Sequence, residues 1–242
     1  MAHEQENWLC RTERLFGKAA VARLASCRVA VFGLGGVGGY AAEALARSGI
    51  GALDLIDNDT VHISNLNRQL YATHKTLGRY KADVAAERIA EINPAAEVRV
   101  HKLFYLPDQD AFFNFKQYDY IIDAVDTVTA KIGLAVQAAK AGVPILSCMG
   151  TGNKTNPAAF EVADIYDTSV CPLARVMRSE LKRRGVPALK LVYSKEPPVR
   201  TNEGGEEDAR VPASNAFVPA AAGFIMAGEA VKDLMGAEIA RP

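Results

Sequence analysis

The chain alternates between short apolar runs and longer stretches in which apolar residues recur with helical spacing. The apolar runs have the length of strands and lie at residues 28–32, 52–56, 98–103, 118–124 and 143–148. The helical stretches between them lie at residues 37–48, 78–92 and 129–142. Strands that alternate with helices usually form a parallel sheet covered on both faces. The pattern therefore predicts an α/β fold with a Rossmann-like, mainly parallel sheet.

The two ends of the chain follow a different order. Residues 8–26 have the spacing of an N-terminal helix, and the C-terminal part predicts a strand and helix extension, with strands at 160–164 and 189–194 and helices at 172–184 and 215–235. Residues 195–213 are rich in proline, glycine and acidic residues, which predicts a mobile loop. We interpret residues 1–242 as one domain with an N-terminal helical segment (1–27), a core (28–150) and an extension (151–242).

Composition narrows the class of protein. With 242 residues, 49% of them hydrophobic, the chain can bury a substantial core. A formal net charge of zero argues against a protein that is basic throughout and held to nucleic acid by its overall field. The four cysteines contain no Cys-x-x-Cys pair, which argues against a tetrathiolate zinc site or a thioredoxin-like motif. Neither an apolar signal core nor a membrane-length apolar run is present, so we expect a cytoplasmic protein.

A glycine-rich loop, GLGGVGG, stands between the first predicted strand and the helix that follows it. Gly33, Gly35 and Gly38 carry the GxGxxG pattern and Gly36 lies within it; in this pattern backbone amides and a helix N-terminus receive a phosphate. By itself this loop favours a nicotinamide or flavin enzyme, the commonest owner of the motif. Asp57, at the end of the second strand, would bind a ribose hydroxyl whichever nucleotide is held.

Charged residues downstream favour a different nucleotide. Asn65, Arg68 and Lys81 follow the ribose-binding acid, and Asp59 belongs to the same acidic cluster. A triphosphate needs fixed cations and a metal, whereas a pyrophosphate bridge needs little beyond glycine amides. Arg68 and Lys81 supply cations, and Asp126 supplies a hard carboxylate suited to Mg²⁺. Arg68 or Lys81 alone is typical of an ordinary surface charge. Together with Asp126, the two cations favour ATP with Mg²⁺.

As a set, these residues resemble the adenylating enzymes related to ubiquitin activation, which include the activators of the molybdopterin and thiamine sulfur carriers. The resemblance implies that a substrate carboxylate attacks the α-phosphate of ATP, giving an acyl adenylate and pyrophosphate. It also implies that Asp57 holds the ribose and Asp126 the magnesium, while the phosphates contact Asn65, Arg68 and Lys81. The motifs lie at Gly33–Gly39, Asp57, Ser64–Gln69, Lys81 and Asp123–Asp126.

Two further residues enter through the same resemblance. Asp123 is a weaker candidate for the metal, because it also suits a strand end. Arg14, in RTERLFG, matches an arginine that family members contribute to the ATP site of a partner subunit, which implies a homodimer. The alternative for Arg14 is an ordinary exposed helix charge.

Longer segments narrow the resemblance to one bacterial branch, the tRNA threonylcarbamoyladenosine dehydratases. The segments are EALARSGIGALDLIDND, DAVDTVTAK, GNKTNPAAFEVADI and PLARVMRSELKRRGV. The branch implies that ATP activates the threonylcarbamoyl carboxylate on a tRNA adenosine, and that an internal nucleophile then closes a ring with loss of AMP, a net dehydration. On this interpretation residues 151–242 carry substrate and dimer contacts.

Other functions remain open from the sequence. One is adenylation of a ubiquitin-like sulfur carrier ending in Gly-Gly, although the paired Cys-x-x-Cys motifs usual in such activators are absent from this sequence. A second is an NAD(P)-dependent oxidoreductase, and a third is a non-catalytic, nucleotide-dependent scaffold. The sequence specifies no sulfur-transfer or redox partner.

Residues 170–200 form a basic segment. Its basic residues are Arg175, Arg178, Lys182, Arg183, Arg184, Lys190, Lys195 and Arg200. Such a segment can bind a phosphate backbone such as that of tRNA, or it can be the solvated surface of a helix.

Two further residues each have two interpretations. Cys171, before Pro172, is either a thiol activated by the helix dipole or, as we favour, a small packing residue. Lys131 is either a phosphate contact or a solvent-facing charge.

Overall fold

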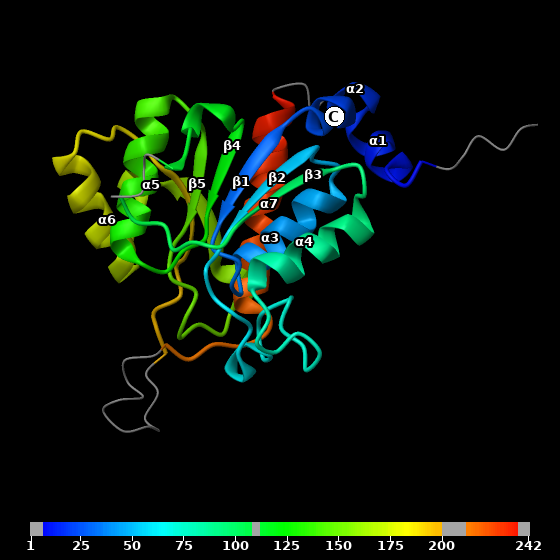
Figure 1. The fold of residues 1–242 in the computed structure, drawn as a ribbon. Helices are drawn as coiled ribbons and strands as arrows, with labels where there is room; N and C mark the ends of the chain where they lie inside the picture. Colours follow the sequence, from blue (N-terminus) through cyan, green and yellow to red (C-terminus); the bar gives the residue numbers. More distant parts are fainter. Residues whose placement is uncertain (1–6, 108–111, 200–211, 237–242) are drawn as a thin grey trace, which may run out of the picture.

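The computed structural model describes residues 7–107, 112–199 and 212–236, and its centre is a seven-stranded sheet (Figure 1). The strand order is β3-β2-β1-β4-β5-β7-β6; β6 pairs antiparallel with β7, and the other pairs are parallel. The predicted α/β class with a mainly parallel sheet is confirmed. The strands are β1 (Arg28–Phe32), β2 (Ala52–Ile56), β3 (Glu97–His101), β4 (Tyr120–Asp123), β5 (Ile145–Cys148), β6 (Phe160–Asp164) and β7 (Lys190–Ser194).

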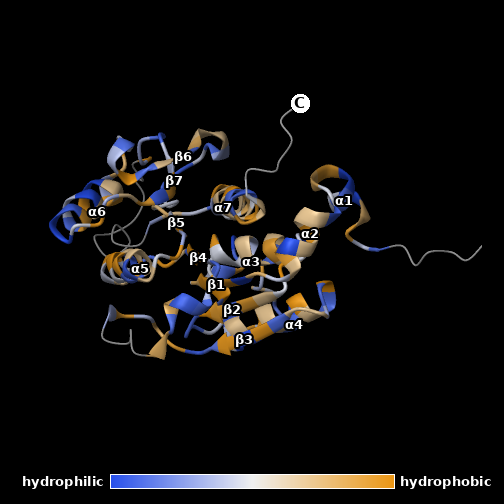
Figure 2. Ribbon diagram, turned by 90° about the horizontal axis from the view of Figure 1, so that it is seen from above, coloured by the Kyte–Doolittle hydropathy of each residue, from blue (hydrophilic) through white to orange (hydrophobic). Residues whose placement is uncertain are grey.

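Helices cover both faces of the sheet (Figure 2). On one face, α3, α4 and α7 pack on strand residues such as Val31, Leu53 and Val192. On the other face, α5 and α6 pack on Ile121 and Tyr193. Neighbouring residues of a strand point to opposite faces, so a strand buried on both sides is apolar throughout. The helices are α1 (Cys10–Phe16), α2 (Lys18–Ala25), α3 (Gly38–Arg47), α4 (Lys81–Ile92), α5 (Val128–Ala141), α6 (Pro172–Arg183) and α7 (Val218–Met235).

The prediction of one continuous helix over residues 8–26 is wrong. The chain forms two short helices, α1 and α2, that meet at Gly17. Gly17 has φ of 88°, in the left-handed region that glycine tolerates and an α-helix cannot contain. Within the described residues, no helix combines the length and the apolar character that crossing a bilayer requires.

Asp54 is a buried carboxylate on β2 that forms hydrogen bonds with residues of both neighbouring strands, β1 and β3. Arg28 donates to Asp54 Oδ1 at 2.8 Å, the His101 ring Nε2 lies 2.9 Å from Oδ2, and the Tyr118 hydroxyl donates to Oδ2 at 3.2 Å. Burial alone would raise the pKa of Asp54, but the hydrogen bonds from His101 and Arg28 hold it below its ordinary value. The ionised carboxylate is therefore the form that stabilises the fold.

We expect Asp54→Asn to lower the free energy of unfolding by about 3 kcal/mol near neutral pH, since it leaves Arg28 without its buried partner. The difference from wild type should shrink below about pH 4, because the wild-type carboxylate loses its stabilising contribution as pH falls through its lowered pKa. Urea unfolding between pH 7 and pH 2 measures this. Asp83→Asn, at an exposed ion pair with Lys102, is the control. An Asp54→Asn deficit that is constant across this range contradicts the assignment.

Candidate active site

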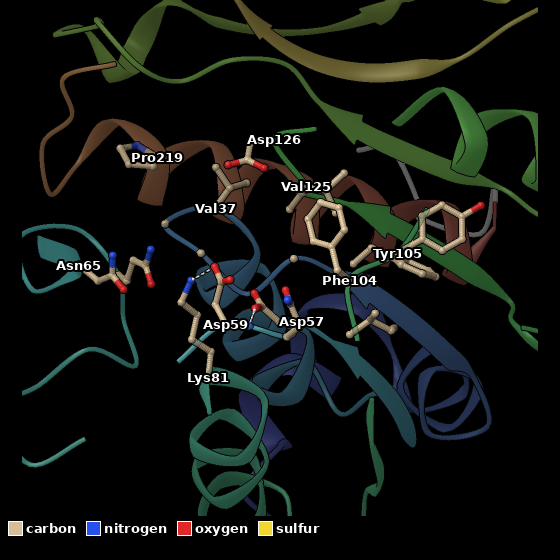
Figure 3. Close-up of a pocket in the computed structure, with 18 of the residues that line it drawn as sticks. Val37, Asp57, Asp59, Asn65, Lys81, Phe104, Tyr105, Val125, Asp126 and Pro219 are labelled. Atoms are coloured by element: carbon tan, nitrogen blue, oxygen red, sulfur yellow. Dashed lines mark hydrogen bonds and ion pairs between the residues drawn. The ribbon is translucent and has the colours of Figure 1, made fainter. Parts of the chain in front are cut away.

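A pocket of about 350 Å³ lies at the carboxyl ends of the central parallel strands (Figure 3). It opens beside β1, whose neighbours β2 and β4 connect to helices on opposite faces of the sheet. Ligands of open α/β sheets bind at this kind of topological switch point. The polar and glycine residues of the lining include Gly33, Gly35, Gly36, Asp57, Asn58, Asp59, Asn65, Arg68, Gln69, Lys81, Asp126, Thr151 and Ser214.

The glycine loop forms one wall of the pocket through close backbone packing. Gly33 has φ of +86°, and a Cβ added there would lie 2.7 Å from the Ala124 carbonyl oxygen. A Cβ added at Gly38 would lie 1.7 Å from the carbonyl oxygen of Gly33. Gly33, Gly35 and Gly36 line the pocket, whereas Gly38 begins α3 behind them. Gly38 therefore lets the helix start close to the loop and does not itself face the cavity.

Asp57 joins the end of β2 to the glycine loop. Its Oδ2 accepts a hydrogen bond from the Leu34 amide at 2.7 Å, and its Oδ1 accepts one from the Asp59 amide at 2.8 Å. Burial raises the pKa of the Asp57 carboxyl, while the charge of Lys81 and the two amides oppose that rise. The two hydrogen bonds fix the carboxylate at the pocket wall, where it can accept a hydrogen bond from a hydroxyl group of a ligand.

Lys81 is the first residue of α4 and points into the pocket. Its side chain is 7% exposed, and its Nζ lies 2.7 Å from Asp59 Oδ2 (Figure 3). The Asp59 side chain is 61% exposed, so one side of this ion pair faces the cavity. An anionic ligand can compete with Asp59 for the ammonium group.

Arg68 and Asn65 come from the loop between β2 and α4. Asn65 is buried, and its Oδ1 accepts a hydrogen bond from the His62 amide at 3.0 Å. This bond stabilises a short 3₁₀ turn at residues 63–65. Arg68 donates to the Ser64 carbonyl at 2.8 Å and to Asn67 at 2.9 Å. The described residues provide no carboxylate partner for Arg68. The pocket therefore contains a guanidinium group that is not neutralised.

Asp126 faces the pocket opposite Lys81, just before α5 (Figure 3). Within the described ranges, its carboxylate accepts a long hydrogen bond from the Thr127 hydroxyl at 3.4 Å and has no ion-pair partner. No three His, Cys, Asp or Glu side chains of the described residues gather closely enough to hold a metal ion. Mg²⁺ commonly binds one or two protein carboxylates together with substrate phosphates, and Asp126 fits that mode.

One end of the pocket is apolar, and this end was not predicted from the sequence. Phe104, Tyr105 and Val125 lie at this end, away from Asn65 (Figure 3), and Ile56 and Leu103 belong to the same apolar cluster as Tyr105. An apolar and aromatic surface of this kind suits a planar base. The available signal was the apolar segment LFYL at residues 103–106, which extends past the end of the predicted strand.

Thr151 and Ser214 also line the pocket, and the Asn67 side-chain amide donates to the Ser214 carbonyl at 3.2 Å. Asn153, with φ of 56°, donates from its amide to the Ala213 carbonyl at 2.8 Å, and its Oδ1 accepts the Ala213 amide at 2.8 Å. The Val199 amide also donates to the Asn153 carbonyl at 2.8 Å. Most of the predicted mobile loop 195–213 lies outside the described residues, but its described ends are hydrogen-bonded beside the pocket.

Several predicted site residues lie elsewhere. Arg14 is exposed on α1 and is not among the residues that line the pocket of its own chain. Helix α1 lies near the amino ends of the central strands (Figure 1). Both interpretations of Lys131 are wrong, because it is 1% exposed and pairs with Asp123. Asp123 as a metal candidate is also wrong, since its buried carboxylate contacts Lys131 and Ser147. Cys171 is buried in the apolar cluster between α6 and the sheet, which supports the packing interpretation.

The basic segment is neutralised only in part by nearby acids. Arg183 and Arg184 both pair with Glu180, Lys190 pairs with Glu229 and Asp233, and Lys195 pairs with Glu161. Arg178 donates to Thr168, and Arg200 lies outside the described residues. Arg175, Arg178 and Lys182 have no acidic partner in the described ranges. The segment is therefore less available to a phosphate backbone than its composition indicates.

Comparison with known proteins matches the chain to the ThiF family model over residues 9–241. The tRNA threonylcarbamoyladenosine dehydratase of Bacillus subtilis is 43% identical over 238 residues, covering 93% of each chain. The Escherichia coli protein of the same name is 42% identical over 71% of this chain and 64% of its own length.

Solved structures of E. coli tRNA N6-threonylcarbamoyladenosine dehydratase in complex with AMP and with ATP each superpose with a TM-score of 0.86 at 35% identity. Each alignment covers 97% of this chain, with 98% of the AMP-bound chain and 97% of the ATP-bound chain. The chain therefore belongs to the ThiF family, in the branch of the tRNA threonylcarbamoyladenosine dehydratases.

Proposed function

We propose that this protein is an ATP-dependent tRNA threonylcarbamoyladenosine dehydratase, an AMP-forming enzyme of the ligase type. The observation that carries the proposal is a pocket that brings Arg68, Lys81 and Asp126 around the glycine loop, in a chain similar over 93% of its length to a dehydratase of that name. An unneutralised guanidinium, a buried lysine and a free carboxylate suit a triphosphate with its metal better than a dinucleotide.

The proposal gives a role to each group that lines the pocket. Phe104 and Tyr105 would contact the adenine, and Asp57 would accept hydrogen bonds from the ribose hydroxyls. The glycine-loop amides, Asn65, Arg68 and Lys81 would hold the phosphates, with Lys81 released in part from Asp59. Asp126 would bind Mg²⁺, which neutralises phosphate charge during transfer.

The proposed chemistry has two steps. First, an oxygen of the threonylcarbamoyl carboxylate attacks the α-phosphorus of ATP, the bond to the bridging oxygen breaks, and pyrophosphate leaves. Second, the carbamoyl group of the same substrate attacks the acyl carbon, loses one proton, and AMP leaves as the ring closes. The nucleophile is already tethered beside its target, so its effective concentration is high. Arg68 and Lys81 would stabilise the charge that develops at the α-phosphate.

We also propose a homodimer in which Arg14 acts on the site of the other subunit. Arg14 lies outside the pocket of its own chain, so a catalytic role requires a second chain. Leu15, 73% exposed on α1, and Phe224, 51% exposed on α7, are large apolar side chains that a subunit interface would cover.

Mass spectrometry of tRNA nucleosides tests the proposal. After incubation of threonylcarbamoyladenosine-containing tRNA with the protein, Mg²⁺ and ATP, the modified nucleoside should lose the mass of one water. Omission of ATP should prevent the loss, and AMP should accumulate with the product. An unchanged nucleoside rejects the proposal. Pyrophosphate exchange that requires a carrier protein ending in Gly-Gly would instead indicate a sulfur-carrier activator, and thermal stabilisation by NADH but not Mg·ATP would indicate an oxidoreductase.

A further inference from the structure

A buried ion pair lies directly behind the pocket wall. Lys131 Nζ donates to both carboxylate oxygens of Asp123 at 3.0 Å and lies 3.3 Å from the Ser147 hydroxyl, which itself donates to Asp123 Oδ2 at 2.5 Å. The side chains of Lys131 and Asp123 are 1% and 0% exposed, and Ser147 is fully buried. We call these three residues the Lys131 network. None of them lines the pocket.

The network joins three elements that meet at the carboxyl end of the sheet. Asp123 is the last residue of β4, Ser147 is its register partner on β5, and Lys131 lies in the first turns of α5. The chain leaves Asp123 directly into Ala124, Val125 and Asp126, which all line the pocket.

The turn at residues 124–126 has few other supports. The Val125 amide donates to Asp123 Oδ1 at 3.3 Å, and the Ala124 amide donates to the Phe32 carbonyl at 2.8 Å. Displacement of the Asp123 carboxylate would therefore free the Val125 amide. It would also shift Ala124 against Gly33, where the backbones already approach closely.

A need for stability does not explain why this position is charged. Replacing a buried ion pair by apolar residues of similar volume is often neutral or stabilising. A lysine that donates to both oxygens of one carboxylate does, however, fix the orientation of that carboxylate, which an apolar pair cannot do. Catalytic groups need such support, because a misplacement of about 1 Å costs about a hundredfold in rate.

We propose that Lys131 is a positioning residue for adenylation: through Asp123 it fixes the turn that carries Asp126 into the pocket. The inference rests on the proposed function, because Asp126 acts only if the pocket binds ATP with its metal. Lys131 does not line the pocket, so its effect should fall on turnover more than on nucleotide binding.

The test compares three variants of the full-length protein: the paired change Asp123→Asn with Lys131→Met, the conservative Lys131→Arg, and Lys140→Met as a control. Lys140 is an exposed residue near the end of the same helix. For each we would measure thermal unfolding, the Kd of ATP, the rate of pyrophosphate formation with modified tRNA, and hydrogen exchange of the peptide containing residues 124–127.

The paired variant should fold and bind ATP within about threefold of wild type, because ribose and base contacts remain. Its turnover should fall at least about tenfold, and amide exchange at residues 124–127 should accelerate at least about tenfold. In Lys131→Arg, turnover and amide exchange at residues 124–127 should both stay closer to the wild-type values than in the paired variant. Turnover and exchange equal to those of Lys140→Met would overturn the proposal.

If the paired variant does not fold, Ser147→Ala replaces it, since this change removes one hydrogen bond to Asp123 and no charge. It should lower turnover about threefold or more with faster exchange at residues 124–127, and wild-type values of both would overturn the proposal. Failure of the proposed function is separable: the wild-type protein would then form no pyrophosphate with modified tRNA, while the exchange measurement would still report on the turn.

Discussion

Replacement of Lys81 or Asp126 by alanine should lower ATP-dependent turnover of modified tRNA by about a thousandfold or more, without unfolding the protein. Lys81 is the buried cation of the pocket, and Asp126 is the carboxylate that fits the metal. Losing one fixed group that stabilises developing phosphoryl charge costs about 10²–10⁵ in rate. Pyrophosphate release with saturating modified tRNA measures the loss.

Thermal unfolding separates a catalytic defect from a folding defect. The Asp126 carboxylate is exposed, and the loss of Lys81 leaves only the largely exposed Asp59 without a partner, so both variants should unfold within a few degrees of wild type. Lys75→Ala, in an exposed part of the loop before α4, is the matched control and should retain wild-type turnover. Near wild-type pyrophosphate release in either Lys81→Ala or Asp126→Ala would show that the pocket residues are assigned wrongly.

The alternation of strands and helices could be predicted because each period appears directly in the apolar pattern. The break at Gly17 could not, because apolar residues continue with helical spacing on both sides of it, and a helix tolerates one glycine at a cost of about 1 kcal/mol. What the pattern cannot show is that Gly17 has φ of 88°. That conformation depends on how α1 and α2 pack, which is a property of the tertiary structure.

Part of the polar lining of the pocket was predictable. Asp57 and Asp126 lie at or just past the ends of predicted strands, and Arg68 and Lys81 are cations that follow Asp57 in the sequence.

Phe104 and Tyr105 were not predicted as pocket residues, because apolar residues directly after a predicted strand are indistinguishable in sequence from a continuation of that strand. Lys131 was considered as a phosphate contact or a solvent-facing charge, and its burial could not be predicted from the sequence. Its two partners, Asp123 and Ser147, come from separate strands, and only the folded sheet shows that the three side chains meet away from water.

Gly38 tests whether close backbone packing forms the nucleotide site. A Cβ at this position would lie 1.7 Å from the Gly33 carbonyl oxygen, a backbone atom that cannot rotate away. Gly33 cannot retreat freely either, because its own position is limited by the backbone of Ala124. Gly38→Ala must therefore move the glycine loop or the start of α3.

We expect Gly38→Ala to lower the free energy of unfolding by about 1–3 kcal/mol, the usual cost of overpacking, and to weaken ATP binding about tenfold or more, because amides that hold phosphate act only when correctly placed. Chemical denaturation and calorimetric titration with Mg·ATP measure the two effects. Gly228→Ala is the matched control, since an added Cβ on α7 meets no atom within 4 Å, and a helical glycine replaced by alanine should leave stability unchanged or raised by up to about 1 kcal/mol. If Gly38→Ala binds ATP as wild type does, the loop can shift without loss, and the affinity must come from Arg68, Lys81 and the apolar end of the pocket.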